Sequence, residues 1–202
     1  MKMLKNIFTL PAVALTTFFL STADNSFAAD KYEVDRAHSS LGFKVSHMLI
    51  AKVSGSFSDF TVDLLFDEKE IAKSSVKTVI QSAGIRTGNN DRDNHLRSPD
   101  FFDVQKYPEI VFTSKKLVKK GGEYLLTGDF TMHGVSKQLE IPFQLRGPIT
   151  DPWGNVRIGI EANLTLNRMD YGVSWSSTLD NGGLVVSNEV EIELSIEAVK
   201  AK

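Results

Sequence analysis

Apolar and polar residues alternate one by one along much of this chain, and this period of two constrains the fold more than any other feature. Between positions 135 and 146, the apolar residues Leu139, Ile141, Phe143 and Leu145 take odd positions, and polar residues take most of the even ones. Successive side chains of a β-strand point to opposite faces, so this pattern predicts strands with one dry and one wet face. The same alternation recurs in the segments 41–45, 60–66, 110–112, 124–132, 156–166 and 184–196.

Glycine-containing turn signals separate these segments and are typical of hairpins between antiparallel neighbours. They lie at 119–123, 133–134, 147–155 and 181–183. The chain then has about eight strands, with helical turns expected only at 67–73 and within 89–112. Phe57 falls out of phase with the strand that follows it, which predicts a β-bulge near Gly55. Such strands can close into a barrel or stack as a sandwich; the length of the last ones favours the barrel, which also removes exposed sheet edges.

The first 28 residues predict a secretory signal peptide. Lys2 and Lys5 precede an apolar run from Ile7 to Leu20, and the small residues Ser26 and Ala28 suit a cleavage site directly after Ala28. The apolar run is broken and too short to span a bilayer comfortably, so no integral membrane span is expected.

The remaining residues, 29–202, are expected to form one all-β domain with its own core. The whole sequence has 23 Lys+Arg against 25 Asp+Glu, and it has no cysteine. This charge balance gives no reason to expect nucleic acid as a partner. The lack of cysteine excludes a disulfide framework, a thiolate nucleophile and a cysteine-type zinc site. Packing alone must therefore stabilise the fold.

Five segments, in register along the chain, resemble one known family. They are HSSLGFKVSHM (38–48), SGSFSDF (54–60), DNHLRSPDFFDVQKYPEIVFTS (93–114), GDFTMHGVSKQLEIPF (128–143) and NRMDYGVSW (167–175). Together they resemble the YceI-like family of polyisoprenoid-binding periplasmic proteins. The resemblance implies an extended, lipocalin-like antiparallel barrel of eight strands that holds a long isoprenoid-type amphiphile. It also implies a bacterial periplasmic or secreted carrier without enzymatic activity, and frequent homodimers.

The dry faces supply the candidate residues for binding such a ligand. The predicted lining and lid residues are Phe43, Phe60, Phe101, Phe102, Phe112, Leu126, Gly128, Phe130, Ile141, Phe143, Leu164, Tyr171, Trp175 and Val186. Small residues on dry faces, at Gly128 and Ala162, would leave room for a ligand, although they also occur opposite large residues in a packed core. Each buried methylene contributes about 0.8 kcal/mol, so a long chain needs little polar recognition.

The segment 89–112 sets a charged run against two adjacent phenylalanines. Ser98 followed by Pro99 predicts the start of a single helical turn, which would present Phe101 and Phe102 to one end of the barrel. The charged residues before it would face solvent. The turn is either a lid over a bound chain, which is our preferred hypothesis, or a plug for a barrel filled by its own side chains.

Polar residues near the strand ends are the candidates for contacting a ligand's head group. They are His38, His47, Arg92, His95, Arg168 and Asn188. The histidines lack the spacing of a shared metal site, so no metal ion or other cofactor is expected. No G-x-S-x-G nucleophile elbow is present. Two alternative hypotheses remain: an enzyme that modifies a lipid or small molecule through its histidines, and a secreted stress factor that acts through its surface.

Overall fold

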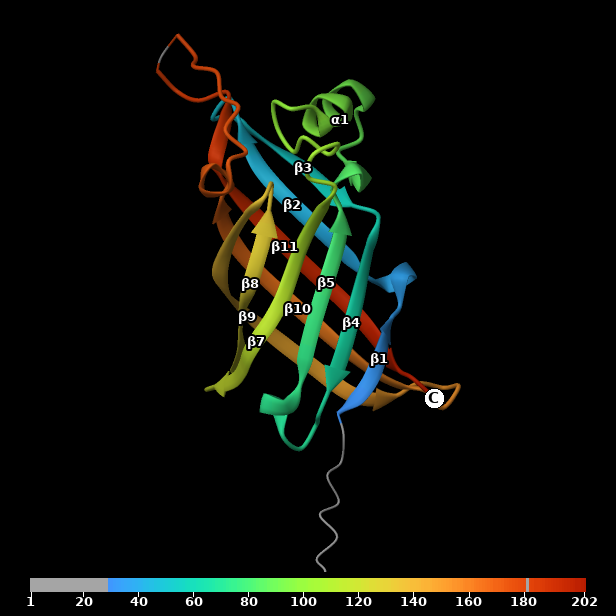
Figure 1. Ribbon diagram of the computed structural model, residues 1–202. Coiled ribbons are helices and arrows are strands. Elements are labelled where there is room, and N and C mark those ends of the chain that lie inside the picture. The colour runs from blue at the N-terminus through green and yellow to red at the C-terminus, as the bar shows by residue number, and fades with distance from the viewer. Residues whose placement is uncertain (1–28, 181) are drawn as a thin grey trace, which may run out of the picture.

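Eight long antiparallel strands close into a barrel, as the alternation and the resemblance predict (Figure 1). The computed structural model describes residues 29–180 and 182–202, so the predicted signal peptide lies outside the described residues. The strand segments are β1 (Asp30–Val34), β2 (Ser40–His47), β3 (Ala51–Phe57), β4 (Phe60–Phe66), β5 (Ser75–Gln81), β6 (Ile85–Arg86), β7 (Glu109–Lys120), β8 (Glu123–Met132), β9 (Val135–Thr150), β10 (Val156–Asn167) and β11 (Val186–Lys200). The helical elements are α1 (Asn90–Arg97), η1 (Arg36–His38), η2 (Ile71–Lys73), η3 (Ser82–Gly84) and η4 (Arg168–Tyr171).

Three neighbouring barrel strands are each interrupted once, which is why eight strands appear as eleven segments. Element η1 separates β1 from β2, residues 58 and 59 separate β3 from β4, and η3 separates β5 from β6. Every strand pairs with the next along the chain, and β1 closes the ring on β11 through Tyr32 opposite Lys200 and Val34 opposite Ala198. The barrel therefore has a simple up-and-down order without exchanged strands.

Gly55 does not mark the bulge that the sequence predicts there. β2 and β3 pair without a register shift along their whole shared length, and the break falls at Ser58 and Asp59 instead. A Cβ atom on Gly55 would lie 2.3 Å from Cζ of Phe43. The missing side chain thus makes room for an aromatic ring from the neighbouring strand.

Two of the predicted hairpins join neighbouring barrel strands directly. The turns at 119–123 and 133–134 connect β7 to β8 and β8 to β9, and β9 and β10 are joined by a loop shorter than predicted because β9 runs on to Thr150. The stretch 181–183, of which residue 181 is not described, connects no two barrel strands. It lies in the longer link from η4 to β11, where Thr178 and Leu184 form an isolated bridge.

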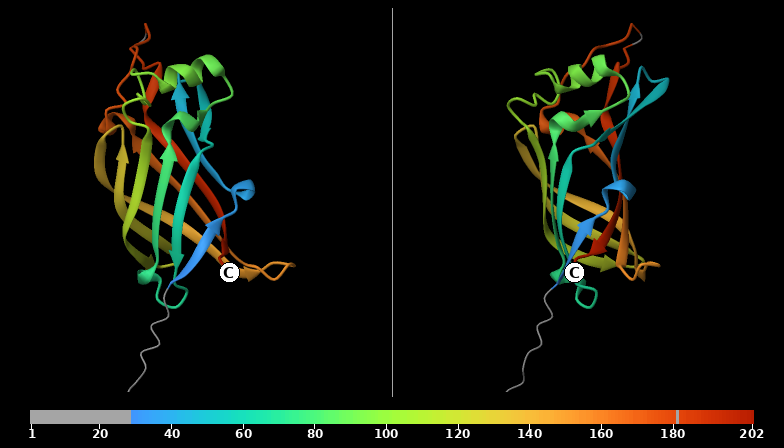
Figure 2. Two further views of the ribbon diagram at one scale, coloured as in Figure 1. Left: turned by 45° about the vertical axis from the view of Figure 1, so that its right-hand side comes forward. Right: turned by 90° about the vertical axis from the view of Figure 1, so that its right-hand side faces the viewer.

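The two ends of the barrel carry different elements (Figure 2). Both ends of the described chain, element η2 and the loop between β9 and β10 lie at one end, which we call the terminal end. Helix α1, the link from η4 to β11 and the tip between β2 and β3 lie at the other, which we call the lid end. The segment with the paired phenylalanines is thus placed over one mouth of the barrel.

The helix at the lid end begins and ends earlier than the sequence predicts. Asn89 caps α1 by accepting a hydrogen bond from the backbone N–H of Arg92, so the charged run itself is helical. Ser98 ends this helix rather than starting one, and turns follow at 99–102 and 104–106. Proline disfavours the helical conformation in the residue before it, and Ser98 is extended, with ψ at 170°.

Candidate functional site: an apolar cavity along the barrel

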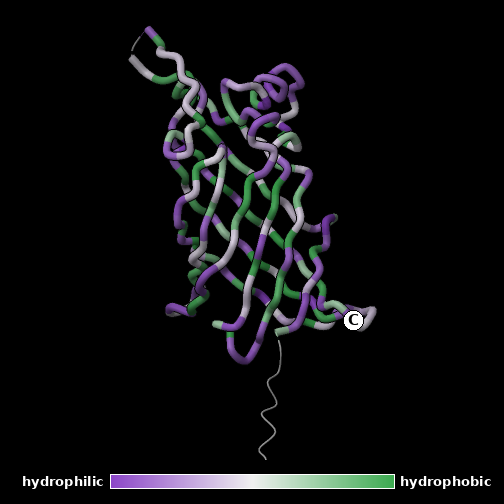
Figure 3. The backbone as a smooth tube through the Cα atoms, in the orientation of Figure 1, coloured by the Kyte–Doolittle hydropathy of each residue, from purple (hydrophilic) through white to green (hydrophobic). Residues whose placement is uncertain are grey.

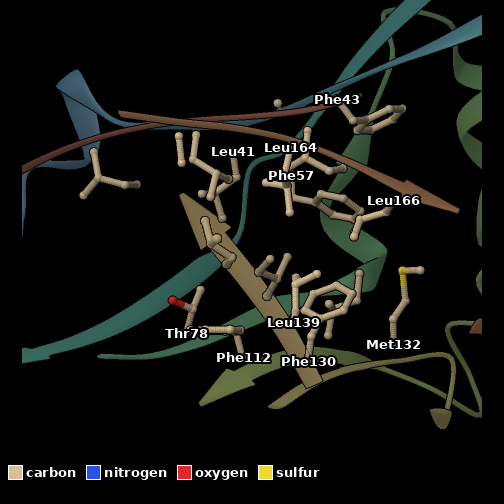
Figure 4. A pocket seen from close by; sticks show the side chains of 18 of the residues that line it. Leu41, Phe43, Phe57, Thr78, Phe112, Phe130, Met132, Leu139, Leu164 and Leu166 are labelled. Carbon is tan, nitrogen blue, oxygen red and sulfur yellow. The ribbon is translucent and has the colours of Figure 1, made fainter. Parts of the chain in front are cut away.

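The inward-facing side chains leave a cavity of about 280 Å³ inside the barrel. A single water molecule needs only about 10–15 Å³ by this measure, so the cavity is large. Its lining runs from Phe66 and Ile71 at the terminal end to Phe101 and Phe102 at the lid end. Figure 4 shows side chains from opposite walls pointing into this common space. Four of its lining residues carry polar side chains, namely Ser74, Ser75, Thr78 and Arg168.

The period-two pattern explains why the lining is apolar. Hydrophobic and hydrophilic residues alternate along the strands in Figure 3, and the pleat turns every second side chain inward. Of the residues proposed from sequence to contact a ligand, the following line the cavity: Phe43, Phe101, Phe102, Phe112, Leu126, Phe130, Ile141, Phe143, Leu164 and Val186.

Phe60 and Gly128 lie outside this lining for separate reasons. The guanidinium group of Arg36 lies over the Phe60 ring, 4.0 Å from its centroid, and donates to the Phe60 carbonyl. A Cβ atom on Gly128 would lie 2.6 Å from Cζ of Phe112. The space left by this glycine is therefore occupied by a phenylalanine of the protein itself.

Tyr171 and Trp175 also lie outside the lining, packed behind it at the lid end. The Tyr171 ring meets Phe130 edge-on at 5.3 Å between centroids, and Trp175 lies 5.2 Å from Phe101. Tyr171 belongs to the buried cluster formed around Phe101, and the partly buried Trp175 packs against this cluster. They support the residues that face the cavity.

Side-chain hydrogen bonds fix the lid segment to the barrel wall. The buried carboxylate of Asp93 accepts from the backbone N–H and the hydroxyl of Thr87, at 2.8 and 2.6 Å. The Arg97 guanidinium donates to the carbonyls of Ala83 and Ile85. The prediction that the charged residues of this segment face solvent is therefore wrong for Asp93. The charged residues of α1 instead position the phenylalanines that follow them.

One of the six head-group candidates, Arg168, lines the cavity. His38 lies on η1 beside Asp35, and His95 lies on α1 between Asp100 and the Trp175 ring. The remaining three are Arg92, which donates to Thr87, and His47 and Asn188, which lie on β2 and β11. The structure does not bring these six residues together.

Arg168 is 5% exposed and donates to four backbone carbonyls. Their residues are Val173, Trp175, Val186 and Ser187, at 2.7 to 3.3 Å. No carboxylate pairs with it among the described residues, and burial lowers the pKa of its guanidinium. It is also the single charged residue of the cavity lining. Arg168 thus clamps the lid-end link onto β11 and places a positive charge beside the cavity.

A second polar cluster lies where the barrel closes. Arg157 donates to Asp35, Asp151 and Glu197 at 2.6 to 3.0 Å, which ties the start of η1, the β9–β10 loop and β11 together. Asp35, His38 and Glu197 come close enough to share a metal ion, an arrangement that their sequence spacing does not suggest. Because Arg157 bonds to both of these carboxylates, the cluster already contains its own cation.

The pair formed by Asp35 and His38 predicts a pH dependence. Hydrogen bonds with His38, and with Arg157, lower the pKa of Asp35 from 3.8 to about 2, and the bond with Asp35 raises the pKa of His38 above 6.5. The Asp35 contribution to stability is complete above pH 3.8 and is lost as the pH falls through 2. The His38 contribution is complete below pH 6.5 and is lost as the pH rises through its raised pKa.

Titration of the histidine ring protons by NMR checks this pair. We expect the midpoint of His38 to lie above 6.5 and to move down in an Asp35→Asn variant. Asp100→Asn is the matched control, because it removes a carboxylate from His95 and leaves His38 untouched. An unchanged His38 midpoint in Asp35→Asn would contradict the assignment.

Sequence reasoning missed the contribution of β5 to the cavity wall. Val76, Thr78 and Ile80 of this strand line the cavity. They alternate with Lys77 and Val79, but the polar Thr78 on the inner face weakens the contrast between the two faces. The alternation itself was the signal that could have identified this strand.

A closed antiparallel barrel of eight strands, with an apolar interior and a helical segment over one mouth, defines the lipocalin-like class of ligand-binding barrels. The chain belongs to the YceI-like family: the family profile of the YceI-like domain matches residues 32–198. A UPF0312 protein of Vibrio parahaemolyticus is 40% identical over 176 residues, which cover 86% of this chain and 88% of that protein.

Solved structures agree with this family assignment. A YCEI protein of Campylobacter jejuni matches with a TM-score of 0.67 at 30% identity, over 83% of this chain and 96% of that one. A domain from Saccharophagus degradans, described as polyisoprenoid binding and implicated in plant cell wall breakdown, matches with a TM-score of 0.61 over 85% of this chain and 99% of that one. Its 16% identity shows the shared fold alone. In the part of the chain that the structure describes, none of the helices has the length and apolar character to cross a membrane.

Proposed function

We propose that this protein is an exported, non-enzymatic binding protein that carries or sequesters a long isoprenoid-type amphiphile inside its barrel. The observation that carries the proposal is the apolar cavity that runs from the terminal end to the lid end. The fold is shared with a domain described as polyisoprenoid binding. The predicted signal peptide supports a periplasmic or secreted location.

The composition of the cavity wall favours a long hydrocarbon chain over a compact polar ligand. Transfer of apolar surface out of water is non-directional and contributes about 0.8 kcal/mol per methylene. A wall with so few polar groups gives a sugar or a nucleotide little compensation for its lost hydrogen bonds with water. The cavity therefore selects for chain length and shape rather than for one chemical identity.

Arg168 supports a fixed orientation of the bound amphiphile. A buried charge is costly unless it has partners, and the described part of the chain supplies carbonyl oxygens but no carboxylate. A head group with an anionic or accepting oxygen would complete this environment. We propose that such a head group lies at the lid end, with its hydrocarbon chain directed toward the terminal end.

A histidine-based enzyme has less support from the structure. None of the four histidines lines the cavity, and two of them, His38 and His95, bond to exposed or half-buried carboxylates outside it. A substrate held in the barrel would lie apart from these imidazoles. The binding function accounts for the cavity without requiring them.

Solvent extraction tests the proposal. The protein, purified from its native host, is extracted with organic solvent and the extract is analysed by mass spectrometry. We expect a long-chain amphiphile, and we expect Ala162→Phe to reduce its amount by about tenfold or more, because a phenyl ring at this lining position fills the space of several methylenes.

The matched control is Thr165→Phe on the same strand. Thr165 is exposed, so this variant adds a ring of the same size to the wet face of β10 and should keep its cargo. An extract without any long-chain amphiphile from the wild-type protein, together with no uptake of a purified prenyl alcohol, would overturn the proposal. Equal cargo in Ala162→Phe and wild type would show that the ligand binds elsewhere.

A further inference from the structure

The tip between β2 and β3 displays three consecutive large apolar residues to solvent. Met48, Leu49 and Ile50 are 40%, 66% and 86% exposed. Met48 and Leu49 also adopt left-handed backbone conformations, with φ of 51° and 65°. Asparagine and glycine tolerate such positive φ values better than methionine or leucine does, so the backbone is strained at both positions. The tip therefore carries residues that suit neither its turn nor its exposure to water.

The backbone of the tip is nevertheless well fixed. The N–H of Met48 donates to the carbonyl of Val185 at 2.8 Å, and that of Ile50 donates to His47 at 3.2 Å. From Ala51 to Gly55, β3 pairs with β2 alone, since β6 meets it only at Ser56 and Phe57. The hairpin thus projects from the barrel at the lid end with its apolar side chains uncovered, as the right-hand view of Figure 2 shows for its ribbon.

The projecting hairpin is continuous with the wall of the cavity. Phe43 and Val45 of β2 line the cavity, and β3 reaches the lid through Phe57, whose ring lies 5.8 Å from that of Phe102. The exposed apolar tip and the lid that covers the cavity therefore lie at the same end of the molecule and are connected through side-chain contacts.

We propose that this tip docks the protein on a lipid bilayer by inserting Met48, Leu49 and Ile50 into the membrane surface. Three side chains are far fewer than the roughly 20–30 residues that each partner contributes to a stable protein interface. A bilayer takes up small apolar protrusions without shape complementarity. The nearest lysine or arginine in the sequence, Lys52, is paired with Glu191 at 2.5 Å, so apolar insertion drives the docking rather than attraction to anionic lipids.

The loop between β9 and β10 serves as an internal comparison. Trp153 in this loop and Ile149 near the end of β9 are also exposed and apolar, but they lie at the terminal end. Asp151 holds this turn by accepting hydrogen bonds from the backbone N–H groups of Trp153 and Asn155. Neither Ile149 nor Trp153 has a positive φ. This loop matches the tip in hydrophobicity but not in backbone strain or in its position relative to the lid.

Vesicle flotation tests the proposal with a substitution that also relieves the strain. The variant Met48→Asn with Leu49→Gly installs residues that tolerate a positive φ, so we expect its thermal midpoint to equal or exceed that of the wild type. We expect the same variant to bind vesicles of phosphatidylethanolamine and phosphatidylglycerol about tenfold more weakly or worse. Ile149→Ser with Trp153→Ser, at the opposite end, should bind as the wild type does.

A thiol probe locates the contact. The natural sequence has no cysteine, so Leu49→Cys and Trp153→Cys each accept a single environment-sensitive fluorophore. We expect vesicles to shift the emission of the probe at 49 to the blue and to leave the probe at 153 unchanged. Equal vesicle binding by the wild type and the tip variant, or a shift at 153 alone, would overturn the proposal. So would sedimentation showing that the wild type dimerises and the tip variant does not, because the tip would then contact a second copy of the chain. Because none of these readouts requires cargo, failure here leaves the proposed ligand binding untouched.

Discussion

Replacing Arg168 with methionine is expected to lower the free energy of unfolding by roughly 3–5 kcal/mol. Methionine fills part of the same volume but leaves the carbonyls of Val173, Trp175, Val186 and Ser187 without their donor. Each buried acceptor without a partner costs about 1–3 kcal/mol, although water entering from the lid end would offset part of this loss. Urea unfolding followed by circular dichroism measures the change.

The matched control is Arg168→Lys, which keeps the charge but cannot reach four carbonyls in the planar arrangement of a guanidinium. We expect its free energy of unfolding to lie between those of the wild type and the methionine variant. Ligand affinities of the wild-type protein separate the structural role of Arg168 from its proposed contact with a head group. We expect a fatty acid to bind more tightly than its methyl ester of equal chain length. Equal affinities would contradict the head-group role, and an unchanged unfolding midpoint in Arg168→Met would contradict the structural one.

Replacing Phe101 with alanine is expected to cost about 3–5 kcal/mol of stability and to speed the release of a bound chain. The ring is buried, lines the cavity and contacts Trp175 and His95 at 5.2 and 5.0 Å between centroids. Its removal enlarges the cavity and takes away one of the contacts through which the lid segment packs at the mouth of the barrel. Denaturant unfolding and the dissociation rate of a prenyl alcohol are the two measurements.

Phe101→Leu is the matched control for this prediction. Leucine keeps most of the apolar volume, so its cost should stay below about 1.5 kcal/mol. If the alanine and leucine variants release their ligand at the same rate, the turn after α1 does not act as a lid. The alternative of a structural plug would then explain the buried phenylalanines.

The fold was largely predictable because the pattern that specifies it is local and repeated. Each alternating segment determines which side chains face inward, so Ile141, Phe143 and Leu164 could be placed on the wall of the cavity without coordinates. The same logic failed at β5, where Thr78 faces inward. It also failed at Gly128, because periodicity places a residue on a face but does not show which neighbouring ring, here that of Phe112, covers it.

The polar residues were harder to place, since their roles depend on contacts between segments far apart in sequence. Arg168 and His38 looked equivalent as candidates, yet one is buried against the cavity and the other lies on the outer wall. The helix at the lid end was misplaced for a different reason. Ser98 fits both the beginning and the end of a helix, and only the capping bond at Asn89 decides which it is.

The interruptions of three adjacent strands divide the wall into two sectors of unequal stiffness. From β7 to β11 the hydrogen-bonded ladders are long, whereas the breaks at η1, at residues 58 and 59, and at η3 lie side by side in the other sector. Spreading two strands costs fewer backbone hydrogen bonds where the ladders are short. Transient separation of the strands should therefore occur first along these three breaks, and amide hydrogen exchange should be fastest in the residues around them.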